Sequence, residues 1–278
     1  MLTVSELFIY PIKSLGGIAI SSALVTERGL QYDRRWMLVD EYHTFISQRE
    51  VAAMALFDVA LQEDGLLVMH RLNGNSILIP FEPQTNEMLI VEVWSDRCRA
   101  IVVSREANHW FSDKLGINCR LVYMPDTVKR SVDDRYAIDK EIVSFADGYP
   151  MLMIGQSSLD DLNSRLQEKL TIQRFRPNIV FTGGEPFEED DLEAFKINDI
   201  LFYGVKLCAR CIITTINPDT ATKGKEPLRT LATYRMRNNE VYFGQNLLYK
   251  GEGQIQVGDE IEVIKRREAT RDFKQAEQ

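Results

Sequence analysis

The sequence contains no uninterrupted run of about 18 apolar residues, the length that a membrane-spanning helix requires. Its first residues, MLTVSELFIYPIKS, lack the basic segment and the long apolar stretch of a secretory signal. Basic residues are in the minority, since 33 Lys and Arg stand against 41 Asp and Glu and give a net charge of −8. We therefore expect a cytoplasmic protein without a membrane span. The charge argues against nucleic acid as its main partner, because phosphate backbones attract basic surfaces.

Cysteine and histidine are scarce. Four cysteines in 278 residues are too few for a disulfide scaffold, so their interest is as metal ligands or nucleophiles. Three histidines show no ligand spacing and give little support to a zinc site. A serine hydrolase is disfavoured as well, because the sequence lacks a Gly-x-Ser-x-Gly motif. The residues concerned are Cys98, Cys119, Cys208, Cys211, His43, His70 and His109.

Short strand patterns dominate the first 103 residues. Apolar or alternating runs bounded by turn residues recur there, and Asp64-Gly65 marks a hairpin between two of them. This density of short strands is typical of a barrel or a sandwich. Strand patterns return at residues 192–205 and 253–264. The strands expected before residue 104 cover residues 3–12, 36–41, 44–47, 55–61, 66–70, 76–80, 89–94 and 100–103.

Two stretches carry a helical pattern. Residues 104–116 have apolar side chains at helical spacing and end at Gly116, which favours a C-cap. Residues 157–170 place four leucines on one face, and Ser158 with Asp161 resembles a capping box. Both stretches are therefore predicted to be helices.

The two kinds of pattern divide the chain. We expect a strand-rich unit at residues 1–115 and an α+β unit at residues 116–266, with a soft boundary at residues 103–125. No Gly/Ser-rich linker separates the units, so they are expected to pack tightly and share a cleft. The tail, residues 267–278, lacks an apolar stripe and is expected to be mobile.

The stretch VKLCARCIITTINPDT, residues 205–220, carries a cysteine pair. A Cys-x-x-Cys redox motif begins a helix, whereas the β-branched run after Cys211 favours a strand. A structural zinc site needs four ligands, and the sequence supplies no second pair. Two alternatives fit Cys208 and Cys211 better than a redox pair or zinc. They are buried inert thiols, or a single thiolate ligand whose ionised form is favoured by Arg210.

Cationic and small polar residues form a second signal. Lys13 and Ser14 end a strand and are followed by two glycines, which let backbone amides approach an anion. Arg34 comes just before a strand, and Arg176 and Asn178 flank a proline at the start of another. A ligand that combines an anionic group with a soft metal would use these residues together with a thiolate.

Several segments taken in order resemble the MOSC family, which is named after the C-terminal domain of molybdenum cofactor sulfurase. Within this family, the sequence most resembles the two-part MOSC proteins, which are the mitochondrial amidoxime-reducing components and their bacterial relatives. It implies an α+β, mostly β fold, in which an N-terminal β-barrel domain packs against a β-barrel-rich MOSC domain with a few helices. The segments, which span residues 2–264, are YPIKS, YDRRW, SFADGYP, FRPNIV, CARCIITTINPDT, EPLRTL, FGQNLL and IQVGDEIEV.

The resemblance also implies a site. In such proteins the second cysteine of the Cys-x-Arg-Cys motif binds molybdenum, so Cys211 would be the metal ligand and the catalytic residue. Cys208 would be a packed small hydrophobe without a ligand role. The resemblance further implies that this protein could bind pyridoxal phosphate. The residues at positions that contact the molybdenum–molybdopterin cofactor are Lys13, Ser14, Arg34, Arg49, Asp147, Gly148, Arg176, Asn178, Ala209 and Arg210.

The reaction that the resemblance implies is the reduction of small N-hydroxylated compounds, or related N- and S-oxides, by oxygen atom transfer at molybdenum. Some bacterial relatives continue into a plant-type ferredoxin domain, whose cysteine spacing is absent from this sequence. Electrons are therefore expected from a separate donor protein of the flavin reductase, ferredoxin or cytochrome type. The alternative is a carrier of sulfur or of the cofactor without turnover, with a persulfide on Cys211 as its active group.

Overall fold

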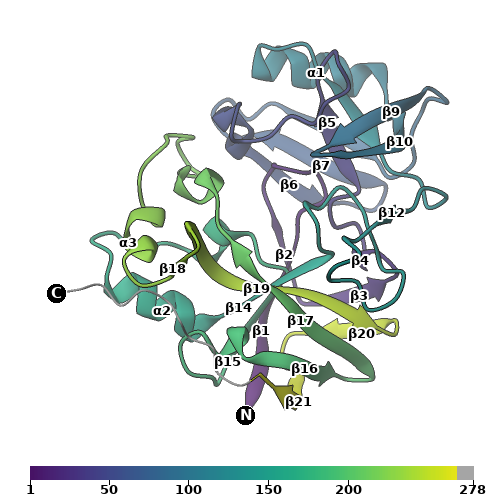
Figure 1. Cartoon of the computed structure of the whole chain (residues 1–278). Helices are drawn as coiled ribbons and strands as arrows, with labels where there is room; N and C mark the ends of the chain where they lie inside the picture. The colour runs from purple at the N-terminus through teal and green to yellow at the C-terminus, as the bar shows by residue number, and fades with distance from the viewer. Residues whose placement is uncertain (268–278) are drawn as a thin grey trace.

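The computed structural model describes residues 1–267, so the mobility predicted for residues 268–278 lies outside the described part of the chain. Arg267 donates its backbone N–H to the carbonyl of Asp191 at 2.8 Å. Figure 1 shows two β-rich halves, one coloured mainly blue and the other green to yellow. The predicted fold class, mostly β with a few helices, is confirmed. Within residues 1–267 no helix has the length and apolar character needed to cross a membrane.

A closed β-barrel forms the green and yellow half (Figure 1). Its strands follow the order β14–β15–β1–β21–β16–β17–β19, and β19 pairs with β14 to close the ring. Neighbouring strands are antiparallel except β14 and β15. The barrel strands are β1 (Leu2–Ile9), β14 (Met151–Gly155), β15 (Ile179–Thr182), β16 (Leu192–Ile197), β17 (Ile200–Ala209), β19 (Glu240–Lys250) and β21 (Glu260–Arg266).

The first strand of the chain lies in this barrel. In β1, Leu7 pairs with Ile179 and Leu2 pairs with Ile261. The sheet pairings therefore cross the expected boundary at residue 115. The smaller strands also join the two ends of the chain, because β3 pairs with both β4 and the C-terminal β20. These additional strands are β2 (Ile18–Ile20), β3 (Ser22–Thr26), β4 (Gly29–Leu30), β18 (Met236–Arg237) and β20 (Gly253–Gln256).

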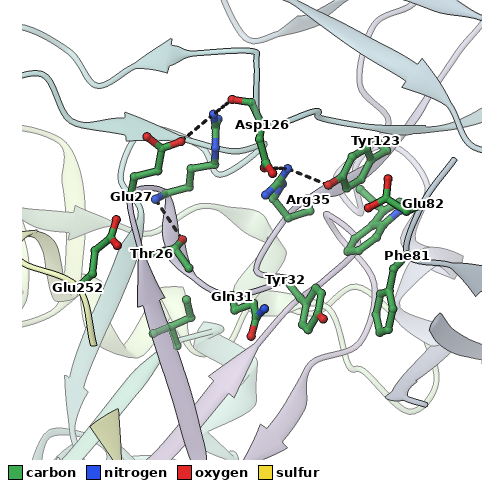
Figure 2. A pocket seen from close by; sticks show the side chains of 13 residues that line it. Thr26, Glu27, Gln31, Tyr32, Arg35, Phe81, Glu82, Tyr123, Asp126 and Glu252 are labelled. Carbon is green, nitrogen blue, oxygen red and sulfur yellow. Dashed lines mark hydrogen bonds and ion pairs between the residues drawn. The ribbon is translucent and has the colours of Figure 1, made fainter. Parts of the chain in front are cut away.

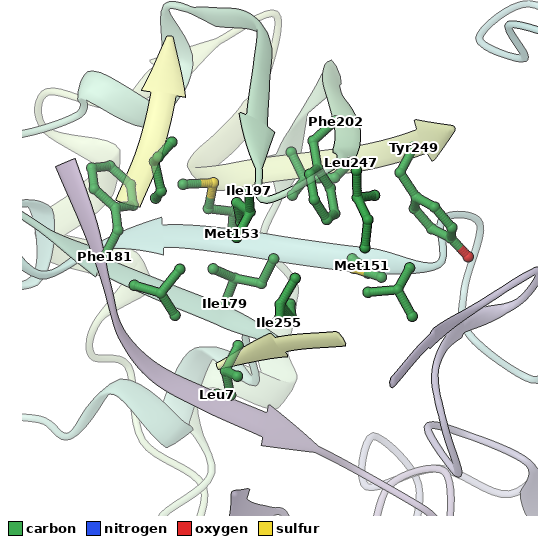
Figure 3. Packing of buried hydrophobic residues seen from close by; sticks show 14 of the residues in the cluster. Leu7, Met151, Met153, Ile179, Phe181, Ile197, Phe202, Leu247, Tyr249 and Ile255 are labelled. Atoms are coloured by element: carbon green, nitrogen blue, oxygen red, sulfur yellow. The ribbon is translucent and has the colours of Figure 1, made fainter. Parts of the chain in front are cut away.

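Apolar side chains fill the barrel (Figure 3). Leu7, Ile179 and Leu247 come from three different strands and are all fully buried. Phe202 stacks on Phe195 of the neighbouring strand, with 5.4 Å between the ring centroids. Burial of this kind stabilises a fold by about 25 cal/mol per Å² of apolar surface. Gly204 has to be a glycine, because a Cβ atom there would lie 2.2 Å from a carbonyl oxygen of β16.

The N-terminal half contains two sheets and two core clusters, of which one is shared by both sheets and the other packs on the four-stranded sheet. A four-stranded sheet has the order β5–β11–β10–β9, and a three-stranded sheet has the order β6–β7–β8. The predicted hairpin at Asp64-Gly65 is confirmed, since Leu61 and Leu66 pair across it. These strands are β5 (Trp36–Val39), β6 (Phe57–Leu61), β7 (Gly65–His70), β8 (Ser76–Pro80), β9 (Met88–Val93), β10 (Asp96–Val102) and β11 (Arg120–Tyr123).

One expected strand and several shorter elements complete the described chain. The strand predicted at residues 44–47 is wrong, because only isolated bridges form there. A small two-stranded sheet pairs β12 with β13. The bounds of these elements are β12 (Arg130–Ser131), β13 (Ile142–Val143), α3 (Leu228–Ala232), η1 (Ala52–Leu56), η2 (Ile172–Phe175), η3 (Glu188–Asp190) and η4 (Ile212–Thr215), the last four being 3₁₀ turns.

Helix α1 (Arg105–Leu115) confirms its prediction at both ends. The Ser104 hydroxyl accepts a hydrogen bond from the backbone N–H of Ala107 at 3.0 Å, as an N-cap does. Gly116 closes the helix in the left-handed conformation, with φ of 66°. Because both caps are local, the sequence alone could specify this helix.

Helix α2 (Gln156–Ser164) is shorter than predicted. The side chain of Asn163 bonds to both backbone polar groups of Leu170 and closes a loop where the helix was expected to continue. The predicted capping box is also wrong. Ser158 lies inside the helix, where its hydroxyl donates to the Glu189 carboxylate at 2.7 Å. A buried tertiary partner therefore takes the hydroxyl that the sequence pattern had assigned to a cap.

Candidate functional site

A cavity of about 300 Å³ is lined by loops of both halves of the molecule. Every residue that the sequence assigned to a site lines this cavity, although the residues come from six separate stretches of the chain. Cys208 lines it as well. The assigned residues are Lys13, Ser14, Arg34, Arg49, Asp147, Gly148, Arg176, Asn178, Ala209, Arg210 and Cys211.

The cysteine segment leaves the barrel at the end of β17. The pairing register of β17 with β19 shifts twice before Ala209, and such bulges re-aim the side chains that follow. The strand expected after Cys211 is wrong, because residues 212–215 form a 3₁₀ turn. The hydroxyl of Thr214 donates to the Cys211 carbonyl at 3.0 Å, and Thr215 bonds in the same way to Ile212. These hydroxyls satisfy carbonyls that a strand would have paired, which offsets the β preference of the sequence.

The two thiols have different neighbours. Arg49 donates from Nη2 to Cys211 Sγ at 3.4 Å, whereas Arg210 donates from Nη1 to Cys208 Sγ at 3.0 Å. The sequence had paired Arg210 with Cys211, so the cation that contacts the predicted ligand is a different one. Arg210 points the other way because its Nη2 binds the Phe175 carbonyl at 2.6 Å. Cys208 also packs against a core cluster, in agreement with a small hydrophobe.

Lys13 and Asp147 form an ion pair across the cavity wall. Lys13 is 6% exposed and also donates to the Phe145 carbonyl at 2.8 Å. Burial lowers the pKa of Lys13, and Asp147 offsets part of that shift. For Asp147, desolvation raises the pKa, but the cations of Lys13 and Arg49 outweigh it and hold that pKa below its usual range. The side chain of Asp147 stays 59% exposed, so this carboxylate is a screened counter-ion at the edge of the cavity.

Arg34 belongs to a buried polar network. Its Nη1 donates to Asp33 Oδ2 at 2.5 Å and to Asn178 Oδ1 at 3.1 Å. Asn178 also accepts from the Leu152 N–H and donates to the Phe8 carbonyl, so both ends of its amide bond to other groups of the protein. Burial lowers the pKa of Arg34, but the Asp33 carboxylate more than compensates and raises it overall. Asn178 therefore orients Arg34 and does not reach toward a ligand.

Arg176 makes few contacts with the protein for a cavity cation. It donates one side-chain hydrogen bond, from Nη1 to the Leu15 carbonyl at 2.6 Å, and its guanidinium lies 4.2 Å from the Tyr10 ring centroid. Burial lowers the pKa of Arg176 to about 10, where it is still charged at neutral pH. Its remaining N–H groups have no hydrogen-bond acceptor within residues 1–267. These donors are available to a ligand.

Three cavity residues have a left-handed backbone without being glycine. The φ angles are 69° at Ser14, 50° at Arg34 and 56° at Arg176. Such conformations cost about 1–3 kcal/mol each and concentrate at functional sites. The glycines after Ser14, which were expected to admit an anion, serve packing instead. A Cβ atom at Gly16 would lie 2.7 Å from a backbone oxygen, and one at Gly17 would overlap the ring of Tyr10.

Sequence reasoning missed two residues that shape the cavity wall. Trp94 donates its indole N–H to Asp147 Oδ1 at 3.1 Å, and the Arg49 guanidinium lies 4.4 Å from its ring centroid. Arg130, 6% exposed, donates to the carbonyls of Ser144, Ala146 and Asp147 and so fixes the loop that carries Asp147. Both act across long sequence separations, and no local pattern marks either of them.

Comparison with known proteins gives the chain a family. The "MOSC N-terminal beta barrel domain" matches residues 1–118, and the "MOSC domain" matches residues 140–262. The Mus musculus protein "Mitochondrial amidoxime-reducing component 1" is 33% identical over 279 residues, which cover 94% of this chain and 82% of that protein. The chain belongs to the MOSC family of the amidoxime-reducing components. The expected family is thereby confirmed.

Further MOSC relatives agree with this assignment. The Homo sapiens "Mitochondrial amidoxime-reducing component 1" is 30% identical, over 94% of this chain and 83% of that protein. The "Molybdenum cofactor sulfurase" of Oryza sativa subsp. japonica is 30% identical, over 92% of this chain but 35% of that protein. The MOSC family is thus associated with the molybdenum cofactor. The relatives above that are amidoxime-reducing components are named as mitochondrial, and the cytoplasmic location of this chain stays a prediction.

The cavity has the donor set that an anionic, metal-carrying cofactor requires. Arg210 Nε is buried without a hydrogen-bond partner among the described residues, and Arg176 has unused N–H groups. Two soft thiols, on Cys208 and Cys211, line the cavity with them, and Arg49 contacts the thiol of Cys211. No group of three or more His, Cys, Asp or Glu side chains within residues 1–267 could hold a metal ion by itself. The site therefore fits a metal that brings further ligands with it, as a dithiolene cofactor does.

Proposed function

We propose that this MOSC protein is a molybdenum-cofactor-dependent reductase of small N-hydroxylated compounds or related N- and S-oxides. The observation that carries the proposal is the position of the Cys211 thiol. It lines the same cavity as Lys13, Arg34, Arg49, Arg176 and Arg210, with Arg49 in contact with its sulfur. A thiolate is a ligand that soft metals accept, and arginine and lysine are the groups that bind phosphate.

The protein's own residues would bind and orient the cofactor. Arg176 and Arg210 retain unused N–H donors, and charge-assisted hydrogen bonds from such groups are worth about 1.5–3 kcal/mol each. Lys13 and Arg34 are held by acidic partners, so they contribute fixed positive charge and wall geometry more than free donors. Ser14, Gly148 and Ala209 offer backbone at the cavity surface. Cys211 would be the protein ligand of the metal.

When bound, such a cofactor would supply oxygen atom transfer, in which an N–OH group, two electrons and two protons give an N–H group and water. This chain contributes shape, charge and one sulfur ligand to that chemistry. Its four cysteines do not have the spacing of a ferredoxin cluster, so we assign the electrons to a separate donor protein of the flavin reductase, ferredoxin or cytochrome type. Lys13 does not suit pyridoxal phosphate, because that cofactor needs a free lysine amine and Lys13 is bonded to Asp147 and to a carbonyl.

The proposal is tested on the full chain purified from a host that makes molybdenum cofactor. We expect stoichiometric molybdenum by elemental analysis and reduction of benzamidoxime to benzamidine with a reduced viologen as donor. The sulfurase relative motivates the alternative of a sulfur or cofactor carrier. Intact-mass measurement separates the two, because a carrier would show a labile extra sulfur on Cys211. Molybdenum-free protein with such a persulfide and without reductase activity would contradict the reductase assignment.

Substitution of Arg176 tests the cofactor contacts. Arg176→Ala is expected to lower cofactor occupancy by at least about tenfold, because it removes a cavity cation with several unused donors. Stability should fall by less than about 1.5 kcal/mol, since only one side-chain hydrogen bond is lost. Pterin fluorescence after oxidative release measures the first quantity and urea denaturation the second. As a control we choose Arg165→Ala, which removes the C-cap arginine of helix α2, a residue that pairs with Asp161 away from the cavity.

A further inference from the structure

A second cavity, of about 480 Å³, lies apart from the candidate cofactor site and shares no lining residue with it (Figure 2). The two cavities meet in the chain at adjacent residues, because Arg34 lines the first and Arg35 lines the second. Its volume is within the range of small-molecule sites, which is about 300–1,000 Å³. Nothing in the proposed reductase chemistry uses this cavity.

Buried N–H donors without partners mark its inner wall. Arg28 is 5% exposed and Trp36 is 1% exposed, yet Arg28 Nε, Trp36 Nε1 and Arg35 Nε have no hydrogen-bond partner within residues 1–267. Arg35 makes its side-chain bonds through Nη2 alone, to Tyr123, Met124 and Asp126. These three atoms have almost no accessible surface, so the unused donors that a ligand in the cavity could reach are the N–H groups of Arg35 Nη1, on a side chain that is 15% exposed.

The two arginines favour an anionic acceptor between them. Burial lowers the pKa of Arg28, and the nearby charge of Arg35 lowers it further, while Glu27 and Asp126 oppose the shift. Glu27 lies 3.1 Å from Arg28, and Asp126 lies 2.7 Å from Arg35. A carboxylate placed between the two guanidinium groups would relieve their mutual repulsion and accept from the unused donors.

Negative charge prevails at the rim of the cavity. Four carboxylates line the cavity, against two guanidinium groups. Of these, Glu82 and Glu252 make no ion pair within the described residues, and both are exposed. A purely anionic ligand is therefore disfavoured, whereas an ammonium group has partners at the rim. Figure 2 shows Glu27 and Glu252 together on one side of the cavity.

Aromatic rings form the other side (Figure 2). Tyr32 and Phe81 stack at 4.6 Å between centroids, and Trp36 lies 5.2 Å from Tyr123. Tyr32 and Phe81 are only partly buried. A planar apolar group can therefore pack against rings that are already ordered.

We propose that this cavity binds a free α-amino acid with an aromatic side chain. Its carboxylate would lie between Arg28 and Arg35, its ammonium group would face Glu27 and Glu252, and its ring would pack on the wall of Tyr32 and Phe81. The three kinds of group occupy the sides that this ligand needs, since Arg35 lies between the acidic pair and the aromatic pair in Figure 2. A zwitterion matches a cavity with unused donors inside and unpaired carboxylates outside.

Calorimetry on the full chain, with and without molybdenum cofactor, tests this proposal. L-phenylalanine and L-tryptophan are expected to bind, and L-phenylalaninamide, 3-phenylpropanoate and L-alanine are expected to bind at least about tenfold more weakly, because each lacks one recognised group. Equal binding of the amide would show that the arginines are not used and would overturn the proposal. Absence of binding by both aromatic amino acids up to about 10 mM would overturn it as well.

A matched pair of variants locates the binding. Glu252→Gln removes a rim carboxylate and is expected to weaken L-phenylalanine binding severalfold, without a change in melting temperature. Glu63→Gln makes the same change at an exposed residue outside the cavity, and binding should be unaffected. Equal affinity in both variants would place the ligand elsewhere. The cofactor cavity contributes no residue to this site, so these results stand or fall independently of the reductase proposal.

Discussion

Replacement of Cys211 by alanine is expected to lower the molybdenum content of the purified protein by at least about tenfold and to abolish reduction of an N-hydroxylated substrate. The variant loses the one thiol that Arg49 contacts at 3.4 Å and that lines the cationic cavity beside Arg176 and Arg210. Few described groups could take its place, because no cluster of three or more metal-ligating side chains lies within residues 1–267. Elemental analysis of protein expressed alongside the wild type measures the loss.

Cys208→Ala is the matched control, because it makes the same chemical change three residues away. Cys208 packs against a core cluster and accepts a hydrogen bond from Arg210, so its loss should leave molybdenum and activity largely intact. The melting temperatures of both variants show whether either one is merely unfolded. Equal loss of metal in the two variants would contradict a single-ligand site and favour a site that uses both thiols.

Short-range patterns predicted the structure well where the stabilising groups are close in sequence. Helix α1 needs Ser104 and Gly116 at its ends, and both capping residues can be recognised in the sequence. The hairpin at Asp64-Gly65 is likewise local. The candidate site is not local, and its six stretches of chain could be gathered only through the family resemblance.

Side-chain hydrogen bonds within short segments, and one long-range strand pairing, decided the features that the sequence did not predict. Residues 212–215 have strand propensity but form a turn, because hydroxyl groups of the turn bind its own carbonyls. Helix α2 stops early because Asn163 closes a loop onto Leu170. Strand β1 joins a barrel whose other strands come from residues 151–266. Such pairings depend on the finished fold, and no window of sequence contains them.

The arginine that contacts Cys211 could not be predicted from its position in the sequence either. Arg210 is next to Cys211 in sequence, but its guanidinium binds Cys208 and the Phe175 carbonyl. Arg49, which is distant in sequence, reaches the sulfur because Trp94 stacks on its guanidinium and Asp147 lies 3.8 Å away. Adjacent residues in an extended segment point in different directions, so sequence proximity is a poor guide to contact.

The second large effect is expected on the free energy of unfolding, when the buried ion pair of Arg34 and Asp33 beside the cavity is broken. Arg34→Met should lower the free energy of unfolding by about 3–5 kcal/mol, because it leaves a buried carboxylate without its counter-ion. The Asp33 side chain is 2% exposed, and its remaining hydrogen bond is from the Tyr10 N–H at 2.7 Å. Arg34 also bonds to Asn178, which links two barrel strands, β1 and β14, to this loop. Urea denaturation of the cofactor-free protein measures the loss.

A second substitution separates the unpaired charge from lost packing. Asp33→Asn in the Arg34→Met background keeps an acceptor for the Tyr10 N–H and removes the charge, so it should restore part of the lost stability. Arg176→Ala, on the same cavity but without an acidic partner, should cost much less than Arg34→Met. If Arg34→Met were no more destabilising than Arg176→Ala, the pair would not support the fold, and Arg34 would be free to serve the ligand instead.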